Sequence, residues 1–350
     1  HPNQHCSIAG HYQGKIAQMP RKTITVTELD PSEVTFIDKA IGGIFLGLFV
    51  LVWLLSIASP FLFALAVLYK YYASATFIAT VTFASYAKWE RGAISKFYQQ
   101  NCNYYSVRYL KTCSIVFEGG QLPSPSKDPT SAQQQTFYAI HPHGVFCIGW
   151  ALLFCHDVMQ HVRFCFAPTL YATPFFRLFS RVTGNPGSAE KQSMIKYMKE
   201  GEDIALPPGG GEEGTLSCMT QDRVFIKKRT GFIKLCLQNG MAVRPVYVFG
   251  EKSLFWNIQG CWKTRFGVNR QGIPTVLPWG HPFFPLIPKN TIPIRVVVGA
   301  PLVLPKIADP TKDDVTTWHN KYIASLNRVF EEHKESAYGD NAKTTKLEIW

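Results

Sequence analysis

The stretch TFYAIHPHGVFCIGW, residues 136–150, ends a run of strand-like apolar residues at His141-Pro142-His143-Gly144. Proline removes a backbone donor and glycine permits unusual backbone angles, so a buried strand has to stop here. Two imidazole side chains therefore follow the end of a strand. In α/β sheets this is the place where reactive groups usually lie, so the stretch is a candidate functional site whose chemistry depends on the rest of the chain.

Strand-like and helical patterns alternate along the globular sequence that begins with this stretch. The predicted strands are 136–140, 162–167, 204–206, 243–249 and 294–298. The predicted helices are 189–200, a segment capped by Thr230 and ended by Gly240, and 313–334. A Gly/Pro/Ser/Gln-rich loop is predicted at 119–135. The alternation predicts an α/β fold in which a mixed sheet is flanked by helices.

An apolar segment precedes the globular part. Between residues 40 and 87 the only strongly charged side chain is Lys70. As one helix, the segment would reach about 72 Å, roughly twice a ~30 Å hydrocarbon core. Ser59 and Pro60 interrupt it, which predicts two helices, 41–58 and 61–87, joined by a tight bend. The 30 uncharged residues at 40–69 disfavour the alternative of a buried helix pair in a soluble protein.

Basic residues flank both ends of this apolar hairpin. They are Arg21, Lys22 and Lys39 before it and Lys88, Arg91 and Lys96 after it. Because positive flanks stay on the cytoplasmic side, both ends are expected to face the cytosol. The predicted organisation is a polar cytosolic segment at 1–39, a membrane hairpin at 40–87 and a cytosolic globular domain at 88–350.

Cysteine usage and charge limit the class of protein. Nine scattered cysteines without a C-x-x-C pair disfavour a disulfide framework and a structural zinc site, and favour a reducing compartment. The net charge of +12 suits nucleic acid, an anionic membrane surface or phosphate-bearing substrates. No nucleic-acid-binding motif accompanies the charge, so the membrane surface is the expected partner.

A second polar element, PPGGGEEGT at 207–215, follows the predicted strand 204–206. His141 or His143 can act as a general base, and Glu212 or Glu213 can orient it. The backbone N–H groups of Gly209, Gly210 and Gly211 suit an oxyanion or phosphate cradle. A metal site made of the two histidines and a carboxylate is the alternative, but no third ligand motif accompanies them.

Together these residues resemble the type 2 diacylglycerol acyltransferase family, whose members carry His-Pro-His-Gly after a membrane hairpin. The resemblance extends over about residues 105–339. Its shared elements are HPHG (141–144), GGGEE (209–213), RTGFIKL (229–235), PVY (245–247), FGE (249–251), VVVGAP (296–301) and HNKYIASLNRVFEEHK (319–334). Phe45-Leu46-Gly47-Leu48 is similar to the family's neutral-lipid motif.

The wider glycerolipid acyltransferases, to which this family is similar, use His-x4-Asp and Glu-Gly-Thr-Arg-Ser elements. Here Phe146 lies five residues after His141 and Ile148 five after His143, so we expect Glu213 to orient the histidine. Leu216 occupies the position of the arginine that grips a phosphate in those relatives. Leucine cannot pair with phosphate, which favours diacylglycerol over glycerol phosphate or lysophosphatidate as acceptor.

The resemblance implies acyl-CoA-dependent acylation of diacylglycerol to triacylglycerol at the endoplasmic reticulum membrane, with lipid droplets as a second location and no cofactor besides the substrate acyl-CoA. We expect His143 to be the base, because Gly144 after it leaves room for substrate, and His141 to donate to the oxyanion or hold the loop. The other expected substrate-binding residues are Gly209, Gly210, Gly211, Glu212, Leu216, Arg229, Gly231 and Lys234.

Three matters stay open at the level of the sequence. Two interpretations suit the basic side chains at Arg223, Lys227, Lys228, Arg229 and Lys234 equally well. They bind the phosphates of coenzyme A, or they form a solvated surface or a membrane-facing patch. Monoacylglycerol or a long-chain alcohol is the alternative acceptor, because acceptor choice depends on the shape of the substrate tunnel. A non-catalytic hairpin protein that coats lipid droplets is the alternative of another class, although it would not need paired histidines and glutamates.

Overall fold

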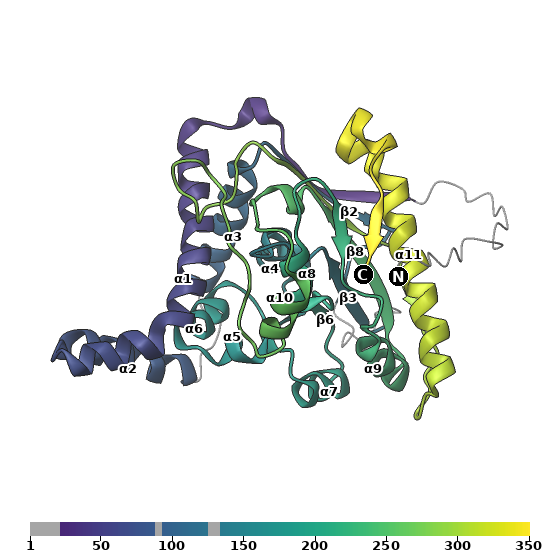
Figure 1. Cartoon of the computed structure of the whole chain (residues 1–350). Helices are drawn as coiled ribbons and strands as arrows, with labels where there is room; N and C mark the ends of the chain where they lie inside the picture. Colours follow the sequence, from purple (N-terminus) through teal and green to yellow (C-terminus); the bar gives the residue numbers. More distant parts are fainter. Residues whose placement is uncertain (1–21, 88–92, 125–133) are drawn as a thin grey trace, which may run out of the picture.

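A mixed β-sheet forms the centre of the protein in the computed structural model, which describes residues 22–87, 93–124 and 134–350 (Figure 1). Its strands lie in the order β1-β2-β9-β8-β3-β6-β4-β5, and β10 pairs with β8. They are β1 (Thr23–Glu28), β2 (Thr112–Glu118), β3 (Thr136–His141), β4 (Arg163–Phe166), β5 (Pro186–Ser188), β6 (Ile204–Leu206), β8 (Ala242–Phe249), β9 (Pro293–Val298) and β10 (Leu302–Val303). A separate parallel pair joins β7 (Asp222–Val224) to β11 (Leu347–Ile349).

The sheet is mixed because β8 runs parallel to β3 and antiparallel to β9. Strands β3 and β6 are parallel neighbours, so the segments that follow their carboxyl ends meet at one edge of the sheet. His141 is the last residue of β3 and pairs with Tyr247 of β8. The predicted α/β fold is confirmed, and the predicted strands agree with the observed ones to within about two residues at each end.

Helices cover both faces of this sheet. They are α1 (Phe36–Leu68), α2 (Tyr72–Tyr86), α3 (Ala93–Tyr109), α4 (Ile148–Cys155), α5 (Pro168–Ala172), α6 (Pro174–Thr183), α7 (Lys191–Lys199), α8 (Gly210–Leu216), α9 (Gly231–Asn239), α10 (Trp262–Asn269) and α11 (Lys312–Tyr338). Alternate residues of β8 face opposite cores. Val246 and Val248 belong to the core with α4, whereas Tyr247 and Phe249 belong to the core with α9 and α11.

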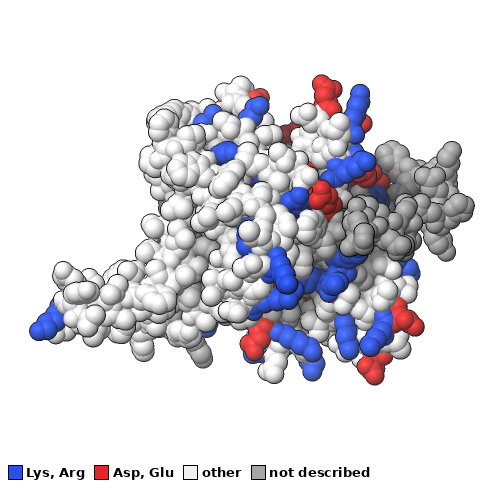
Figure 2. Space-filling view, viewed as in Figure 1, with Lys and Arg blue, Asp and Glu red and all other residues white. Residues whose placement is uncertain are grey.

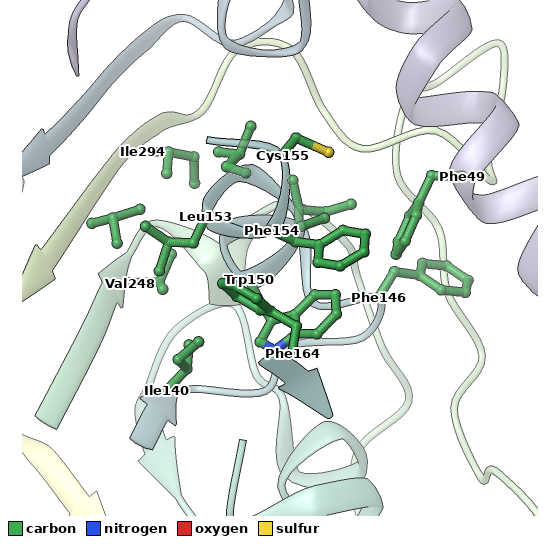
Figure 3. Packing of buried hydrophobic residues seen from close by; sticks show 14 of the residues in the cluster. Phe49, Ile140, Phe146, Trp150, Leu153, Phe154, Cys155, Phe164, Val248 and Ile294 are labelled. Carbon is green, nitrogen blue, oxygen red and sulfur yellow. The ribbon is translucent and has the colours of Figure 1, made fainter. Parts of the chain in front are cut away.

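The core around α4 is built largely from aromatic and branched side chains (Figure 3). Trp150 stacks on Phe154 at 5.2 Å and meets Phe164 of β4 edge-on at 5.1 Å. Phe49 of α1 packs edge-on against Phe176 of α6, so α1 takes part in this core. Burial of such large side chains supplies much of the favourable free energy of folding.

The signals predicted for the ends of α9 and α11 are met in part. Gly240 has φ 67° and ends α9, as predicted. Thr230 directly precedes α9, but its side chain makes no capping hydrogen bond. Helix α11 is longer than predicted, and a capping box between Thr311 and Asp314 starts it.

The predicted bend at Ser59 and Pro60 is wrong, because α1 continues to Leu68. Pro60 has no N–H to give the carbonyl of Ser56, but the Ser59 hydroxyl donates to that carbonyl at 2.9 Å. The chain turns instead at Lys70, which has φ 61°. The two-helix arrangement therefore exists, but its turn lies about ten residues later than the sequence suggested.

The helices differ in whether they are long enough to cross a membrane. Among the described helices, only the 33-residue α1 is long and apolar enough to do so. The 15 residues of α2 rise about 22 Å, less than a ~30 Å hydrocarbon core. Of the two helices in the predicted membrane hairpin, α2 is therefore too short to span a membrane, and the hairpin itself stays a prediction.

The described part of the first segment belongs to the same sheet as the rest of the chain. β1 precedes α1 and pairs antiparallel with β2, while α3, which follows α2, packs on α1. Both ends of the α1–α2 unit are thus attached to one body, and in Figure 1 its far end projects from that body at left. Arg21, Lys88, Arg91 and the middle of the predicted loop 119–135 lie outside the described residues.

Candidate active site

His141 lies at the carboxyl end of β3 and is completely buried. Its Nδ1 lies 3.0 Å from Oε1 of Glu213, which α8 supplies, and its Nε2 lies 2.9 Å from the hydroxyl of Tyr322 on α11. A carboxylate can only accept, so Nδ1 carries the proton and Nε2 accepts from Tyr322 when the ring is neutral. Both ring nitrogens are therefore used inside the protein.

Glu213 is the centre of this hydrogen-bond network. Besides the His141 ring, its two oxygens accept the backbone N–H groups of His143 and Phe225, each at 2.7 Å. Burial acts to raise the pKa of Glu213, but the neighbouring His141 and the two N–H donors outweigh it and lower that pKa. The group is therefore an ionised carboxylate that holds the backbone of the His-Pro-His-Gly loop.

His143 is only partly buried, and its ring makes a different contact. Nδ1 lies 2.8 Å from the carbonyl oxygen of Gly144, which only accepts, so Nδ1 carries the proton. The lone pair of the neutral ring is then on Nε2. Desolvation lowers the pKa of His143, which keeps the ring neutral and able to take up a proton near pH 7.

This geometry differs from the expected one in a specific way. Glu213 was expected to orient the ring of the catalytic histidine, and His143 was the expected base. Glu213 instead binds the ring of His141 and reaches His143 only through its backbone N–H. The orienting acceptor of the His143 ring is the carbonyl oxygen of Gly144, which a sequence motif cannot reveal because every residue has a carbonyl.

The position of Gly144 is explained by close packing. The residue has φ 62°, and a side chain on it would collide with the carboxylate of Glu251. Glu251 accepts the backbone N–H groups of Ile148 (3.0 Å) and Gly149 (2.7 Å) at the start of α4. Glu251 thus fills the space where a side chain on residue 144 would stand, and the expectation that Gly144 leaves room for substrate stays a prediction.

Glu251 is itself completely enclosed. Desolvation raises the pKa of its carboxyl group to about 7, although the two N–H groups of α4 oppose this shift. The carboxyl group therefore changes its charge near neutral pH, next to the loop that carries His143.

The glycines of the second element let α8 approach the His-Pro-His-Gly loop. A methyl group on Gly214 would lie 3.1 Å from Nδ1 of His143, and one on Gly209 would collide with Glu213. Gly210 has φ 61°, and Gly211 packs against Asn269 of α10. Packing thus accounts for these glycines, and the cradle of N–H groups expected at 209–211 stays a prediction.

The expected basic residues lie beside α8 and on the surface near it. Arg229 forms a 2.6 Å ion pair with Glu212. Gly231 and Lys234 are exposed in the first turn of α9. Figure 2 shows Lys and Arg side chains gathering over the part of the surface where α7, α9 and α10 lie. Arg223 is bound to Glu348 at 2.9 Å, so part of its charge is already compensated.

Leu216 ends α8 and is completely buried. The carbonyl oxygen of the preceding Thr215 accepts from Asn257 and from Arg265, each at 3.2 Å. The Arg265 guanidinium also donates to the carbonyl oxygens of Thr275 (2.7 Å) and Ile258 (2.8 Å), so it is committed to the protein's own backbone. A direct contact between Leu216 and the acceptor stays a prediction.

Two residues at the site were not identified from the sequence. Tyr322 lies within the shared element 319–334 and received no role, because its place in a predicted helix says nothing of its hydroxyl group. Glu251 was noted within Phe249-Gly250-Glu251 without a role. Its signal was a carboxylate two residues after the end of the buried strand β8.

Helix α1 contacts the loop that carries His143. Phe146, three residues after His143, packs edge-on against Trp53 of α1 at 5.2 Å and against Phe255 at 5.0 Å. The loop therefore lies between α1 and the segment that follows β8.

The alternative of a metal site is disfavoured by the hydrogen bonds of His141, because both of its nitrogens already have partners. In the described part of the chain, one group of metal-ligand type exists elsewhere, at Glu118, Glu332 and His333. Arg328 lies 2.6 Å from the Glu118 carboxylate and already neutralises it.

Comparison with known proteins gives a consistent result. A family model described as diacylglycerol acyltransferase matches residues 56–349. Diacylglycerol O-acyltransferase 2 of Danio rerio is 28% identical over 271 residues, which cover 70% of this chain and 69% of that protein. 2-Acylglycerol O-acyltransferase 3 of Homo sapiens is 28% identical, and the alignment covers 68% of this chain and 72% of that protein. Acyl-CoA wax alcohol acyltransferase 2 of Homo sapiens is 27% identical, and the alignment covers 71% of this chain and 75% of that protein.

One solved structure also aligns with the chain. The 1-acyl-sn-glycerophosphate acyltransferase from Thermotoga maritima covers 79% of this chain and 97% of its own, at 15% identity and a TM-score of 0.38. At that score the alignment carries no argument about this protein.

Proposed function

Because this chain belongs to the diacylglycerol acyltransferase family, we propose that it transfers the acyl group of acyl-CoA to the free hydroxyl of diacylglycerol, forming triacylglycerol. As a member of that family it is a membrane-associated O-acyltransferase that uses acyl-CoA. The observation that carries the proposed mechanism is a difference between the two histidines. Both ring nitrogens of His141 have partners inside the protein, whereas Nε2 of His143 is free within the described part of the chain.

In the proposed mechanism His143 is the general base. Its Nε2 takes the proton of the acceptor hydroxyl as the hydroxyl oxygen attacks the thioester carbon. The new C–O bond forms, the C–S bond breaks, and the proton passes from His143 to sulfur, so that coenzyme A leaves as the thiol. The hydrogen bond from Nδ1 to the Gly144 carbonyl supports this role, since it keeps Nε2 unprotonated before the reaction.

His141, Glu213 and Tyr322 are proposed to be positioning residues. Glu213 holds the His143 backbone N–H, the His141 ring holds Glu213, and the Tyr322 hydroxyl holds His141. An oxyanion role for His141 is disfavoured, because its donor is already given to Glu213. Of the amides expected at 209–211, that of Gly210 donates to the Pro207 carbonyl oxygen at 3.1 Å, so those of Gly209 and Gly211 are the proposed donors to the developing oxyanion.

A neutral acceptor is proposed because the arginine that would grip a phosphate is absent. Leu216 takes its position, and the nearby Arg265 is bound to backbone carbonyls. Relatives of similar identity are named for acylating diacylglycerol, 2-acylglycerol or wax alcohol. Monoacylglycerol and long-chain alcohols are therefore the alternative acceptors.

Arg229, Gly231 and Lys234 are proposed to receive the phosphates of coenzyme A. Arg229 lies beside the active-site helix through its ion pair with Glu212, and Lys234 is exposed one turn into α9. Phosphate groups bind well to such a combination of a fork-shaped guanidinium and a mobile ammonium group.

The proposed location is the endoplasmic reticulum membrane with the catalytic domain in the cytosol, and lipid droplets as a second location. The attachment of β1 and α3 to the same body supports a unit whose two ends stay on one side of the membrane. Protease added to sealed microsomes should digest the globular part. Full protection of that part would contradict this topology.

The test of the function is a comparison of acceptors with one labelled acyl-CoA and chromatographic readout of the lipid product. The purified enzyme should use diacylglycerol at least ~100-fold better than lysophosphatidate, about 3 kcal/mol, the scale of one lost charged hydrogen bond. Comparable rates on both would mean that another residue binds the phosphate. A higher rate on monoacylglycerol or a long-chain alcohol would replace diacylglycerol as the acceptor.

A further inference from the structure

A proline-rich loop, residues 271–288, follows α10 and concentrates exposed apolar side chains. It contains no Lys, Arg, Asp or Glu, and Arg270 and Lys289 flank it. The side chains at its tip are the most exposed, with 83% for Phe283 and 63% for Phe284. Four more large apolar side chains of the loop are exposed: Ile273, Leu277, Trp279 and Leu286. Apolar side chains gathered in this way mark an interaction surface.

The backbone of the proline-rich loop suits an apolar environment. Four hydrogen bonds close its tip, from the N–H of Gly280 to Pro285 O, of His281 to Ile287 O, of Phe284 to His281 O and of Ile287 to Phe284 O. Its five prolines have no N–H to satisfy: Pro274, Pro278, Pro282, Pro285 and Pro288. A backbone N–H group without a partner is costly in lipid. The prolines and the hydrogen bonds of the tip leave few such groups in this loop.

The proline-rich loop continues the apolar surface of α1. Ile287 packs on Gly47 of α1, where an added methyl group would lie 3.3 Å from it, and Tyr109 donates to the Pro288 carbonyl at 2.7 Å. The free face of α1 carries a stripe at heptad spacing that is also exposed, namely Ile37, Ile44 and Leu51. In Figure 1 the loop passes beside the upper part of α1, and α2 continues from the lower end of the same helix.

We propose that the tip of the proline-rich loop inserts into the acyl layer of a lipid bilayer, as a second membrane contact besides the α1–α2 unit. A bilayer is favoured as the occupant because the surface is continuous with that of the apolar helix α1 and lacks charge. Trp279 and the flanking Arg270 and Lys289 are the residue types that gather where a membrane meets water.

The insertion has a structural consequence for the active site. The Leu277 N–H donates to Asn257 at 3.1 Å, and the hydroxyls of Thr275 and Thr215 lie 3.0 Å apart. Thr215 belongs to α8, the helix that supplies Glu213. A loop inserted in the membrane therefore holds α8 close to the lipid surface.

The test uses a photo-crosslinking amino acid in the full-length chain, reconstituted into phosphatidylcholine vesicles that contain a radiolabelled phosphatidylcholine. The crosslinker is placed at Phe283, at Phe61 of the α1–α2 unit, or at Glu331 on the exposed face of α11. Labelled lipid should attach at Phe283 and Phe61 and not at Glu331. This readout does not depend on enzymatic activity, so its result is separate from that of the proposed acylation.

A second pair of variants tests the chemistry of the contact. In the Phe284→Asp background the lipid adduct at Phe283 should fall about tenfold, because a carboxylate opposes insertion into the acyl layer, whereas Phe284→Leu should preserve it. Adduct at Phe61 but not at Phe283 would overturn the proposal, as would a loss of both adducts. A crosslink from Phe283 to a protein in place of lipid would overturn it in favour of a protein interface.

Discussion

The hydroxyl of Tyr322 lies 2.9 Å from Nε2 of His141, although 181 positions separate the two residues in the sequence. Helix α11 thereby connects to the end of β3 inside the protein. The connection continues through Glu213 to the backbone of His143. A chain of buried hydrogen bonds of this kind holds its members in one geometry and is costly to leave incomplete.

Removal of the Tyr322 hydroxyl should therefore affect turnover more than substrate binding. For Tyr322→Phe we expect kcat to fall about tenfold, which corresponds to roughly 1.4 kcal/mol, the scale of one neutral hydrogen bond. KM for acyl-CoA should change less than about twofold, because Tyr322 is buried away from substrate. Initial rates with labelled acyl-CoA measure both.

The matched control for Tyr322→Phe is Tyr197→Phe, which removes a hydroxyl that accepts the Ser188 N–H at 3.3 Å on another part of the fold. Its kcat should equal that of the wild type. An unchanged kcat in Tyr322→Phe, or an equal loss in both variants, would exclude a positioning role for Tyr322.

The two histidines should respond differently to substitution. His143→Ala should lower kcat by ~10³-fold or more, because it removes the proposed base, and should leave the melting temperature unchanged. His141→Ala should also unfold more easily, by about 3 kcal/mol, since Glu213 and Tyr322 lose their buried partner. Assays of activity and thermal unfolding in detergent compare the two. Near-normal turnover in His143→Ala would reject the mechanism.

Activity should persist on the acidic side of neutrality. Burial lowers the pKa of His143 below its usual 6.5, so the base stays neutral as the pH falls through that value. The acid limb of kcat/KM is therefore expected below pH 6.5. Because the pKa of Glu251 is raised to about 7, the profile should also be measured for Glu251→Gln, which removes that titration. An acid limb centred above pH 6.5 in both enzymes would contradict the prediction.

Glu118 should stabilise the fold in a pH-dependent manner. Desolvation opposes its ionisation, but His333, Arg328 and the Ala300 N–H lower the pKa of Glu118 to about 2, from 4.5. A depressed carboxyl pKa gives stability that is present above the unfolded-state pKa and is lost as the pH falls toward the folded-state value. Glu118→Gln should thus cost about 3 kcal/mol at pH 7.

The difference in melting temperature between wild type and Glu118→Gln should shrink between about pH 4.5 and pH 2, where the wild type itself becomes protonated. The control is Glu335→Gln, an exposed position on the same helix α11. A constant difference across that pH range would show that the stabilisation does not come from the charge of Glu118.

The parts of the fold that depend on local pattern could be predicted from the sequence. Strand 204–206 and the end of α9 at Gly240 were predicted where they occur, because apolar runs and glycine signals act over a few residues. The break predicted at Pro60 does not occur, because a proline signal is local and contacts elsewhere in the fold can override it. In the structure the Ser59 hydroxyl satisfies the Ser56 carbonyl, and packing of α1 on α3 and α6 keeps the helix continuous.

In the candidate site, too, the segments could be predicted from the sequence, whereas the contacts between them could not. The residues at 141–144 and 209–213 were predicted to meet, because both segments follow buried strands and parallel strands end at one edge of a sheet. The partner of each polar atom could not be predicted, because a distance of 3 Å between side chains depends on the register of strands and on the packing of helices. Tyr322 and Glu251 enter the site only through such packing.

The sequence by itself therefore determined the α/β class, the apolar segment before it, and the two polar elements at the strand ends, since composition and periodicity over short windows decide these. Only the tertiary structure decided which histidine keeps a free ring nitrogen. His141 gives both nitrogens to Glu213 and Tyr322, whereas His143 binds the carbonyl of Gly144. The physical reason is that hydrogen bonds form between groups that folding brings together, and in the sequence those groups lie up to 181 positions apart.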